Sequence, residues 1–202
     1  MVIELYHDLA KIKSFYYLFL SSVVDMKEFP LVYVKNGKII DENGRKIVDW
    51  KEKVDKFAEI YIMDLDGIER NEPNLDFYQS IYKKKWIDAV PRRFEDVMDL
   101  VVAGGNKIVI REGFDDRDID RIFSEVDVEL YLSLSKDCSL KPYNWNGFVY
   151  LLNEKMGFEV KEFLSELSNV FIIARRKEYI DFDWADENKI DGVAYPLWEM
   201  EA

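Results

Sequence analysis

Short apolar runs recur along the chain, and most are followed by a charged segment in which apolar residues have helical spacing. The runs predict strands at residues 3–6, 60–63, 86–90, 107–110, 129–134, 148–152, 170–174 and 192–197. These strands are apolar on both faces, and they alternate with helical segments. Such a pattern is typical of a parallel sheet that is covered by helices on its outer side.

The segments between the strands place apolar residues at steps of three and four, as expected for a helix that buries one face. The clearest helical patterns lie at residues 49–60, 74–84, 93–105, 118–126 and 159–168. Asn74 is a typical helix N-cap, and Gly104-Gly105 is a stop signal. We expect Lys83-Lys84-Lys85 at the end of the second of these helices, where cations interact favourably with the helix dipole.

About eight strand–helix units in 202 residues match an α/β (βα)₈ barrel, for which about 200 residues is the lower length bound. A doubly wound open sheet is the alternative, but it usually has fewer strands and a glycine-rich phosphate-binding turn. No such turn follows any of the predicted strands. We therefore predict one barrel domain over residues 1–202.

One region departs from the strand–helix alternation. Asn36-Gly37 and Asn43-Gly44 are hairpin turn signals flanked by alternating apolar residues. We expect this hairpin inside an insertion at residues 10–48, between the first strand and the first outer helix. The insertion could cap a site at the top of the barrel, or it could only cover an exposed edge.

The composition argues against several classes of partner. The net charge is −12, and no cluster of Lys and Arg provides the basic surface that nucleic acids require. No apolar run approaches the about 20 residues of a membrane span, and the N-terminus does not resemble a secretion signal. Cys138 is the single cysteine, so a reducing compartment is the default. We expect a cytoplasmic protein, and the absence of threonine with much Lys and Glu is compatible with a thermophilic source.

The stretch Asp64-Leu65-Asp66-Gly67, followed by Glu72-Pro73-Asn74, closes the second predicted strand. It resembles the Asp-Leu-Asp-Gly…Asn signature of the HisA/HisF barrels of histidine biosynthesis, and most of all HisA, the phosphoribosylformimino-aminoimidazole carboxamide ribotide isomerase. Residues 86–112 look like the next βαβ unit of that family, and Asp88-Ala89 with Glu112 are similar to archaeal HisA-related proteins. The resemblance covers about residues 1–10 and 57–112, and it implies a (βα)₈ fold.

The resemblance also implies a role for Asp8, because the family's isomerases use an aspartate at the end of the first strand as one acid/base group. Their second acid/base aspartate belongs at the end of the fifth strand, where this chain has Ser135, with Asp137 two residues further on. HisA-type enzymes grip two phosphates with glycine-rich turns, whose backbone N–H groups approach the phosphate oxygens closely. This chain instead has Asp88-Ala89-Val90-Pro91, Arg111-Glu112, Arg175-Arg176 and Tyr195-Pro196. Proline removes a donor and aspartate repels an anion, which argues against the histidine-pathway isomerisation itself.

In a barrel the C-terminal ends of the strands meet at one mouth. We therefore expect as catalytic residues Asp8, Asp64 and Asp88, and as substrate-binding residues Asp66, Arg92, Arg111, Glu112, Ser135, Arg175 and Arg176. The Asp64–Asp66 pair would face a wet mouth, although it could also cap the next helix. Arg175 and Arg176 could hold an anion where the family uses glycine N–H groups, or they could neutralise nearby acids.

No cofactor or metal is expected. His7 is the only histidine, which rules against a histidine-rich metal site and against a Ser-His-Asp triad. A hard cation such as Mg²⁺ on several carboxylates would be compatible by ligand type alone.

Two hypotheses follow. The first is an acid/base enzyme of isomerase or lyase type that acts on a small anionic metabolite, a sugar phosphate being one example. The second is a catalytically silent barrel that binds a ligand or a protein partner. Trp145, Trp184 and Trp198 could form an association surface, including one between copies of the chain, or they could belong to the core.

Overall fold

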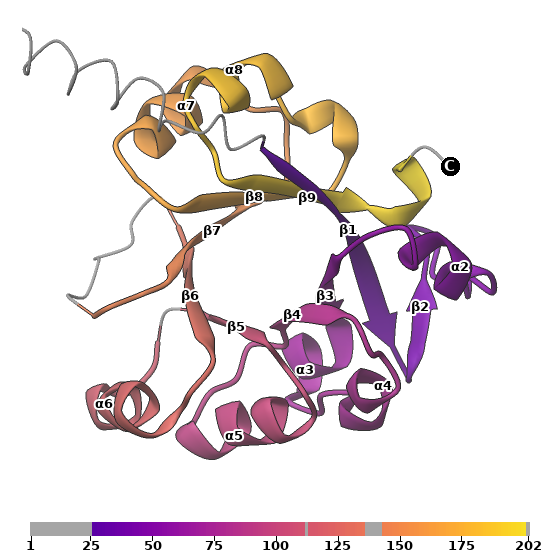
Figure 1. Ribbon diagram of the computed structural model, residues 1–202, viewed down its shortest axis with the longest axis vertical. Helices are drawn as coiled ribbons and strands as arrows, with labels where there is room; N and C mark the ends of the chain where they lie inside the picture. Colours follow the sequence, from indigo (N-terminus) through magenta and orange to yellow (C-terminus); the bar gives the residue numbers. More distant parts are fainter. Residues whose placement is uncertain (1–25, 112, 136–142, 201–202) are drawn as a thin grey trace, which may run out of the picture.

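The computed structural model describes residues 26–111, 113–135 and 143–200. Its strands form one closed ring with helices on the outside (Figure 1). The strands are β1 (Lys27–Lys35), β2 (Lys38–Ile40), β3 (Glu59–Asp64), β4 (Lys84–Asp88), β5 (Lys107–Ile110), β6 (Glu129–Leu134), β7 (Gly147–Leu152), β8 (Val170–Ala174) and β9 (Gly192–Pro196). All except β2 are parallel neighbours in sequence order, and the β1–β9 pairing closes the ring. The predicted (βα)₈ barrel is confirmed.

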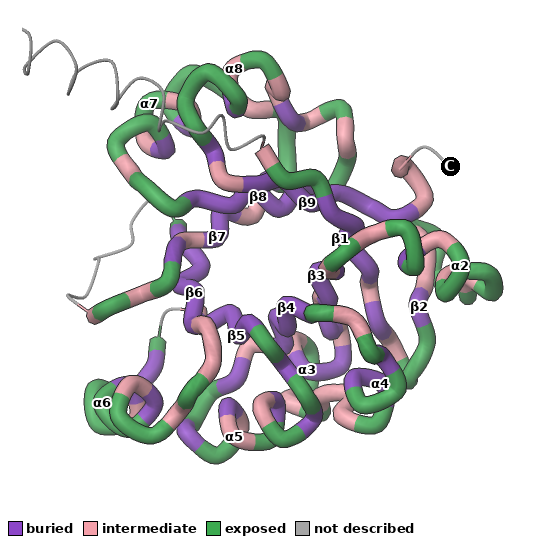
Figure 2. The backbone as a smooth tube through the Cα atoms, viewed as in Figure 1, coloured by how far each residue is buried: buried purple, intermediate pink, exposed green. Residues whose placement is uncertain are grey.

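The helices cover the outer face of the ring, and their outward sides are exposed (Figure 2). They are α2 (Trp50–Val54), α3 (Leu65–Arg70), α4 (Leu75–Gln79), α5 (Phe94–Val102), α6 (Asp116–Glu125), α7 (Phe158–Ser165) and α8 (Phe182–Glu187), with 3₁₀ helices η1 (Lys177–Tyr179) and η2 (Leu197–Glu199). The predicted spacing is clearest in α5, which buries Phe94, Val97 and Leu100. Helices α3 and α8 were not predicted, because six residues are too few to show a repeat.

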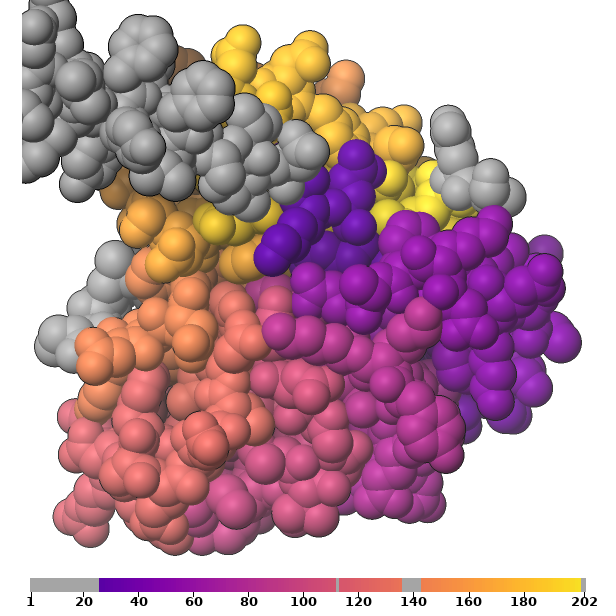
Figure 3. Space-filling view, in the orientation of Figure 1, coloured from indigo at the N-terminus to yellow at the C-terminus, as the bar shows by residue number. Residues whose placement is uncertain are grey.

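Alternation along each strand divides the core into two layers. In β3, Ile60 and Ile62 pack outward against the helices, whereas Tyr61 points into the ring. The residues that fill the ring are Phe29, Leu31, Tyr61, Trp86, Val109, Tyr131, Val149, Phe171, Ile173 and Ala194. The Trp86 ring centroid lies 4.2 Å from that of Tyr131 and 4.7 Å from that of Phe171. In Figure 3 the centre of the ring is filled with atoms, so a site has to lie at one end of the barrel.

Lys107 closes the interior at the N-terminal ends of the strands. Its side chain is almost fully buried, with Nζ 2.9 Å from a Glu59 carboxylate oxygen and 4.1 Å from the Trp86 ring centroid. Burial lowers the pKa of Lys107, although the charges of Glu59 and Glu129 act in the opposite direction. These contacts give the ammonium a structural role beneath the aromatic core.

The predicted hairpin forms, but it is not an insertion. Asn36 and Gly37 have φ values of 50° and 67°, as a type I′ turn requires, and β1 pairs with β2 antiparallel. The other pairings of β1 are parallel, to β3 and β9, so β1 is itself the first strand of the barrel. Local alternation is enough to identify the hairpin. It cannot show that β1 pairs with β9, because β9 lies at the far end of the sequence. The first strand expected at residues 3–6 lies outside the described residues.

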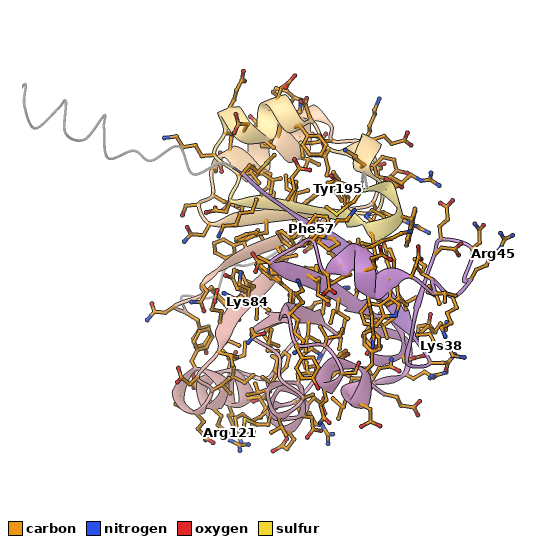
Figure 4. All side chains as sticks on the ribbon, turned by 45° about the vertical axis from the view of Figure 1, so that its right-hand side comes forward. Lys38, Arg45, Phe57, Lys84, Arg121 and Tyr195 are labelled. Atoms are coloured by element: carbon orange, nitrogen blue, oxygen red, sulfur yellow. The ribbon has the colours of Figure 1, made fainter. Side chains whose placement is uncertain are left out.

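The prediction that Lys83-Lys84-Lys85 ends a helix is also wrong. Helix α4 ends at Gln79, and Lys84 begins β4. Lys84 Nζ contacts a Glu129 carboxylate oxygen at 2.7 Å, and Lys85 Nζ donates to the Ile81 carbonyl at 2.8 Å. The three lysines border an open hollow of about 530 Å³ at the N-terminal end of the barrel. In Figure 4, Lys84 lies on the side opposite Lys38 and Arg45 of the hairpin.

Candidate functional site at the barrel mouth

A pocket of about 930 Å³ lies over the C-terminal ends of the strands. Its floor is apolar and consists of Leu31, Met63, Leu151 and Ile173, which belong to the upper part of the interior core. The rest of its lining is Tyr33, Lys35, Ile40, Asp41, Glu42, Asn43, Gly44, Leu65, Ile68, Arg111, Asn153, Arg175, Arg176, Tyr179 and Trp198. The segment after β2 thus forms one wall, and the residues after β7, β8 and β9 form another.

Arg175 is the cation of the pocket that has no carboxylate partner within the described part of the chain. It directly follows β8 and continues the inward-facing series of Phe171 and Ile173. Its neighbour Arg176 is held differently, because one of its guanidinium nitrogens lies 3.0 Å from a Glu42 carboxylate oxygen. This ion pair joins the end of β8 to the connection after β2. Arg175 is therefore available to bind a carboxylate or a phosphate.

Tyr33 faces the pocket from β1. Its ring centroid lies 5.8 Å from that of Trp198, and burial raises the pKa of Tyr33 to about 12. Burial is the largest cause of this shift; the charge of Arg175 acts to lower the pKa, and the smaller effect of the Glu199 carboxylate acts to raise it. The phenol is therefore neutral at pH 7 and can donate a hydrogen bond from its O–H group.

Asp88 and Arg111 form an ion pair at the pocket lining, in which Asp88 is fully buried and the Arg111 side chain is 28% exposed. Arg111 donates from Nε and from Nη2 to the two oxygens of Asp88, at 3.2 and 2.9 Å, and Tyr61 donates its hydroxyl at 2.9 Å. Burial acts to lower the pKa of Arg111, but the Asp88 charge outweighs this effect and the pKa is raised. Asp88 is fully buried. Its carboxylate neutralises Arg111, and a catalytic role for Asp88 stays a prediction.

Asp64 ends β3 and caps α3. Its Oδ1 accepts hydrogen bonds from the backbone N–H groups of Asp66 and Gly67 and from the Asn74 side chain. Its Oδ2 accepts from the Asn74 backbone N–H and from the Tyr78 hydroxyl. Both oxygens are thus occupied, and the residue is fully buried on the helix side of the sheet. This environment favours the capping role over contact with a substrate.

Asp66 is 2% exposed, so the expectation that the Asp64–Asp66 pair faces a wet mouth is wrong. Burial tends to raise the pKa of Asp66, but hydrogen bonds from Asn74 and from the Asn36 backbone, together with the Arg70 charge, lower it overall. Arg70 Nη2 lies 2.7 Å from Oδ1. Asn74 occupies the N-cap position of α4, as predicted, yet its side chain binds the two aspartates instead of the helix. The loop that contains Asn74 folds back over both carboxylates.

The first turn of helix α3, which directly follows β3, is in contact with the turn after β4. A Cβ added to Gly67 would lie 2.8 Å from both the Cβ and the carbonyl oxygen of Ala89. The next residue, Val90, has a φ of 52°, which is costly for a β-branched side chain. Val90 thus adopts, in the turn after β4, a backbone conformation that favours glycine although the residue is a valine.

Comparison with solved structures identifies a similar chain architecture. The structure of N-(5'-phosphoribosyl)anthranilate isomerase from Pyrococcus furiosus is similar over 87% of this chain and 90% of that one, with a TM-score of 0.58 and 13% sequence identity. The chain whose strands β1 to β9 are described above is therefore a TIM barrel. No family model matches the sequence, and no curated protein matches it. At 13% identity the similarity concerns the fold alone, so the resemblance to HisA stays a prediction.

The remaining predicted site residues lie in different places. Arg111, Arg175 and Arg176 line the pocket together. Arg92 is exposed outside the pocket lining, with Nη2 3.5 Å from the Ile68 carbonyl oxygen, and Ser135 is exposed after β6. Asp8 and Glu112 lie outside the described residues. Their roles, like those of Arg92 and Ser135, stay predictions.

Sequence reasoning missed the aromatic residues of the pocket, namely Tyr33, Tyr179 and Trp198. A signal for Tyr33 was present, because Phe29, Leu31 and Tyr33 alternate directly before the Asn36-Gly37 turn. In the described barrel the first strand is β1, and Tyr33 is the inward-facing residue toward its C-terminal end. This is the place where the resemblance implied an acid/base aspartate.

Within residues 26–111, 113–135 and 143–200, no helix is both long and apolar enough to cross a bilayer. No three His, Cys, Asp or Glu side chains there are grouped so that they could hold a metal ion.

Proposed function

We propose that this TIM barrel binds a small anionic metabolite in the mouth pocket and carries out acid/base chemistry of the isomerase type on it. The observation that carries the proposal is the position of Arg175. Within the described chain its guanidinium has no carboxylate partner, and it borders a pocket of about 930 Å³. The pocket lies at the C-terminal ends of the strands, where the active sites of TIM barrels are found.

The pocket supplies the groups that such chemistry needs. Arg175 would bind a carboxylate or phosphate of the ligand through two parallel hydrogen bonds. Tyr33 keeps its proton at pH 7, as a phenol with the ordinary pKa of about 10 also does, and it would act as the hydrogen-bond and proton donor. Asp41 and Glu42 are the carboxylates of the pocket lining, and one of them would accept a proton from the ligand. Glu42 would do so after its ion pair with Arg176 opens.

Binding without turnover is the second candidate function. The burial of two predicted catalytic aspartates in the described barrel favours this candidate. Asp64 and Asp88 are fully buried, and their oxygens are engaged in structural hydrogen bonds. A barrel of this kind would be a ligand-binding or protein-interaction module that retains the pocket.

Thermal-shift measurements test the binding step that both candidates share. The panel contains small carboxylates, phosphorylated sugars and a phosphoribosyl compound, since the name of the similar isomerase includes that group. A ligand at 100 times its Kd should stabilise the protein by about 2.7 kcal/mol. Arg175→Ala should lose this shift, whereas Arg117→Ala, at an exposed position of α6, should keep it. If Arg117→Ala loses the shift and Arg175→Ala keeps it, the anion site has been assigned to the wrong place.

Turnover is tested by proton exchange. The wild-type protein is incubated in D₂O with a ligand that binds, and NMR follows deuterium incorporation or conversion to an isomer. An acid/base enzyme should incorporate deuterium or convert the ligand, and Tyr33→Phe should slow this by a factor of about 10² or more while binding is retained. Binding without either reaction would favour the second candidate.

A further inference from the structure

We infer that the ligand of the mouth pocket is a planar apolar carboxylate, such as an aromatic acid, and not a polyhydroxylated sugar phosphate. This inference rests on the proposed function, since it names the ligand class of the same site. Three properties of the lining support it: the floor, the aromatic wall and the number of unpaired charges.

The floor offers no polar group to a ligand. Leu31, Met63, Leu151 and Ile173 present only apolar side chains there. Sugar hydroxyls placed against this surface would give up hydrogen bonds to water without replacing them. A flat apolar ring would instead bury its own surface together with that of the floor.

Aromatic side chains stand on one side of the pocket. Tyr33 and Trp198 have ring centroids 5.8 Å apart with an angle of 33° between their planes, and Tyr179 also lines the cavity. They come from β1, η2 and η1, so the wall is built where the barrel closes. Rings in such positions favour an aromatic ligand, which can meet them in offset or edge-on contacts.

The charges of the pocket fit an anion with a single charge. Arg111 is neutralised by Asp88, Arg176 by Glu42, and Lys35 by Glu69, with closest nitrogen–oxygen distances of 2.9, 3.0 and 2.9 Å. Arg175 is left as the unpaired cation of the lining within the described chain. One guanidinium balances a carboxylate of charge −1, whereas a phosphate monoester of charge near −2 would remain partly uncompensated. The Asp41 and Glu42 carboxylates of the rim would repel that surplus charge further.

Calorimetric titration compares four probes: benzoate, cyclohexanecarboxylate, ribose 5-phosphate and inorganic phosphate. We expect benzoate to bind at least tenfold more tightly than ribose 5-phosphate and more tightly than the non-planar cyclohexanecarboxylate. Trp198→Leu should weaken benzoate binding about tenfold, and Trp184→Leu, a half-buried tryptophan outside the pocket, should not. If Trp198→Leu does not fold by circular dichroism, Tyr179→Leu takes its place.

The possible results separate the two proposals. Tighter binding of ribose 5-phosphate than of benzoate, with loss of binding in Arg175→Ala, would overturn the aromatic ligand class and leave the anion site intact. Equal binding of benzoate by wild type and by both wall variants would also overturn it. If none of the four probes binds at millimolar concentration, both the ligand class and the proposed anion site fail.

Discussion

Replacing Asp64 by asparagine should destabilise the barrel strongly, although it preserves the shape of the side chain. The carboxylate accepts five hydrogen bonds, three at Oδ1 and two at Oδ2. Asparagine keeps one acceptor oxygen and places an NH₂ group at the other position. If the oxygen stays on the side of the α3 N-terminus, the new NH₂ group faces the Asn74 backbone N–H and the Tyr78 hydroxyl.

The magnitude follows from the groups left without partners. The Tyr78 hydroxyl can rotate and accept from the new NH₂ group, but the Asn74 N–H cannot, and leaving it unpaired costs about 1–3 kcal/mol. The three remaining bonds lose a charged acceptor, and bonds to charged groups contribute roughly twice as much as neutral ones. We therefore expect Asp64→Asn to lower the free energy of unfolding by about 3–5 kcal/mol. Domains of this kind have about 5–15 kcal/mol in total.

Urea unfolding followed by circular dichroism measures this loss. With a slope of about 2–3 kcal/mol per molar urea, the midpoint of Asp64→Asn should fall by more than about 1 M. The control is Asp76→Asn, the same substitution on the exposed side of α4, which should change stability by no more than about 0.5 kcal/mol. If the two variants unfold at the same urea concentration, the Asp64 carboxylate is not the structural centre of this turn, and its candidacy as a catalytic residue would gain weight.

Three further predictions concern neighbouring contacts. Arg111→Met should cost about 3–5 kcal/mol of unfolding free energy, because Asp88 stays buried without its counter-ion; a loss under about 1 kcal/mol in urea melts would contradict this. Gly67→Ala should cost about 1–3 kcal/mol of unfolding free energy through collision with Ala89, and a urea midpoint equal to that of wild type would contradict this. The pKa of Asp66 is lowered in the folded state, so its ionised carboxylate stabilises the fold. This contribution is fully present above the unfolded pKa of about 4, and it is lost as the pH falls through the folded pKa. Asp66→Asn should therefore have a lower free energy of unfolding than wild type at pH 7, and this difference should be smaller at pH 3. A difference that does not change with pH would refute the lowered pKa of Asp66.

The mouth of this barrel is built differently from a phosphate grip of glycine-rich turns. Side chains stand where backbone N–H groups would approach a phosphate: Asp88 and Arg111 pair with each other, and Arg175 with Arg176 follows β8. Val90 keeps a φ of 52° in the turn after β4 without being glycine. A cation on a flexible side chain can accommodate a wider range of anions than a fixed turn, which is why the panel of probes has to be broad.

The sequence by itself determined the repeating units of this protein. The strands at 107–110, 129–134 and 170–174 have the predicted bounds, and the Asn36-Gly37 hairpin forms where its residues indicate. These features depend on neighbours within a few residues, whose alternation or turn chemistry is written locally. The positions of Arg111 and Arg175 at strand ends also predicted that both lie at the mouth of the barrel.

Only the tertiary structure decided which strand closes the ring and which charges are free. β1 pairs with β9, and Glu42 lies against Arg176, a residue 134 positions later in the chain. Asp64 and Asp66 are adjacent to a strand end, yet they are buried because the loop of Asn74 folds over them. Burial and ion pairing depend on segments that meet only after the ring has closed. A charged residue at a strand end can therefore be located from sequence, while its partner, and with it the choice between a structural and a binding role, is set by the fold.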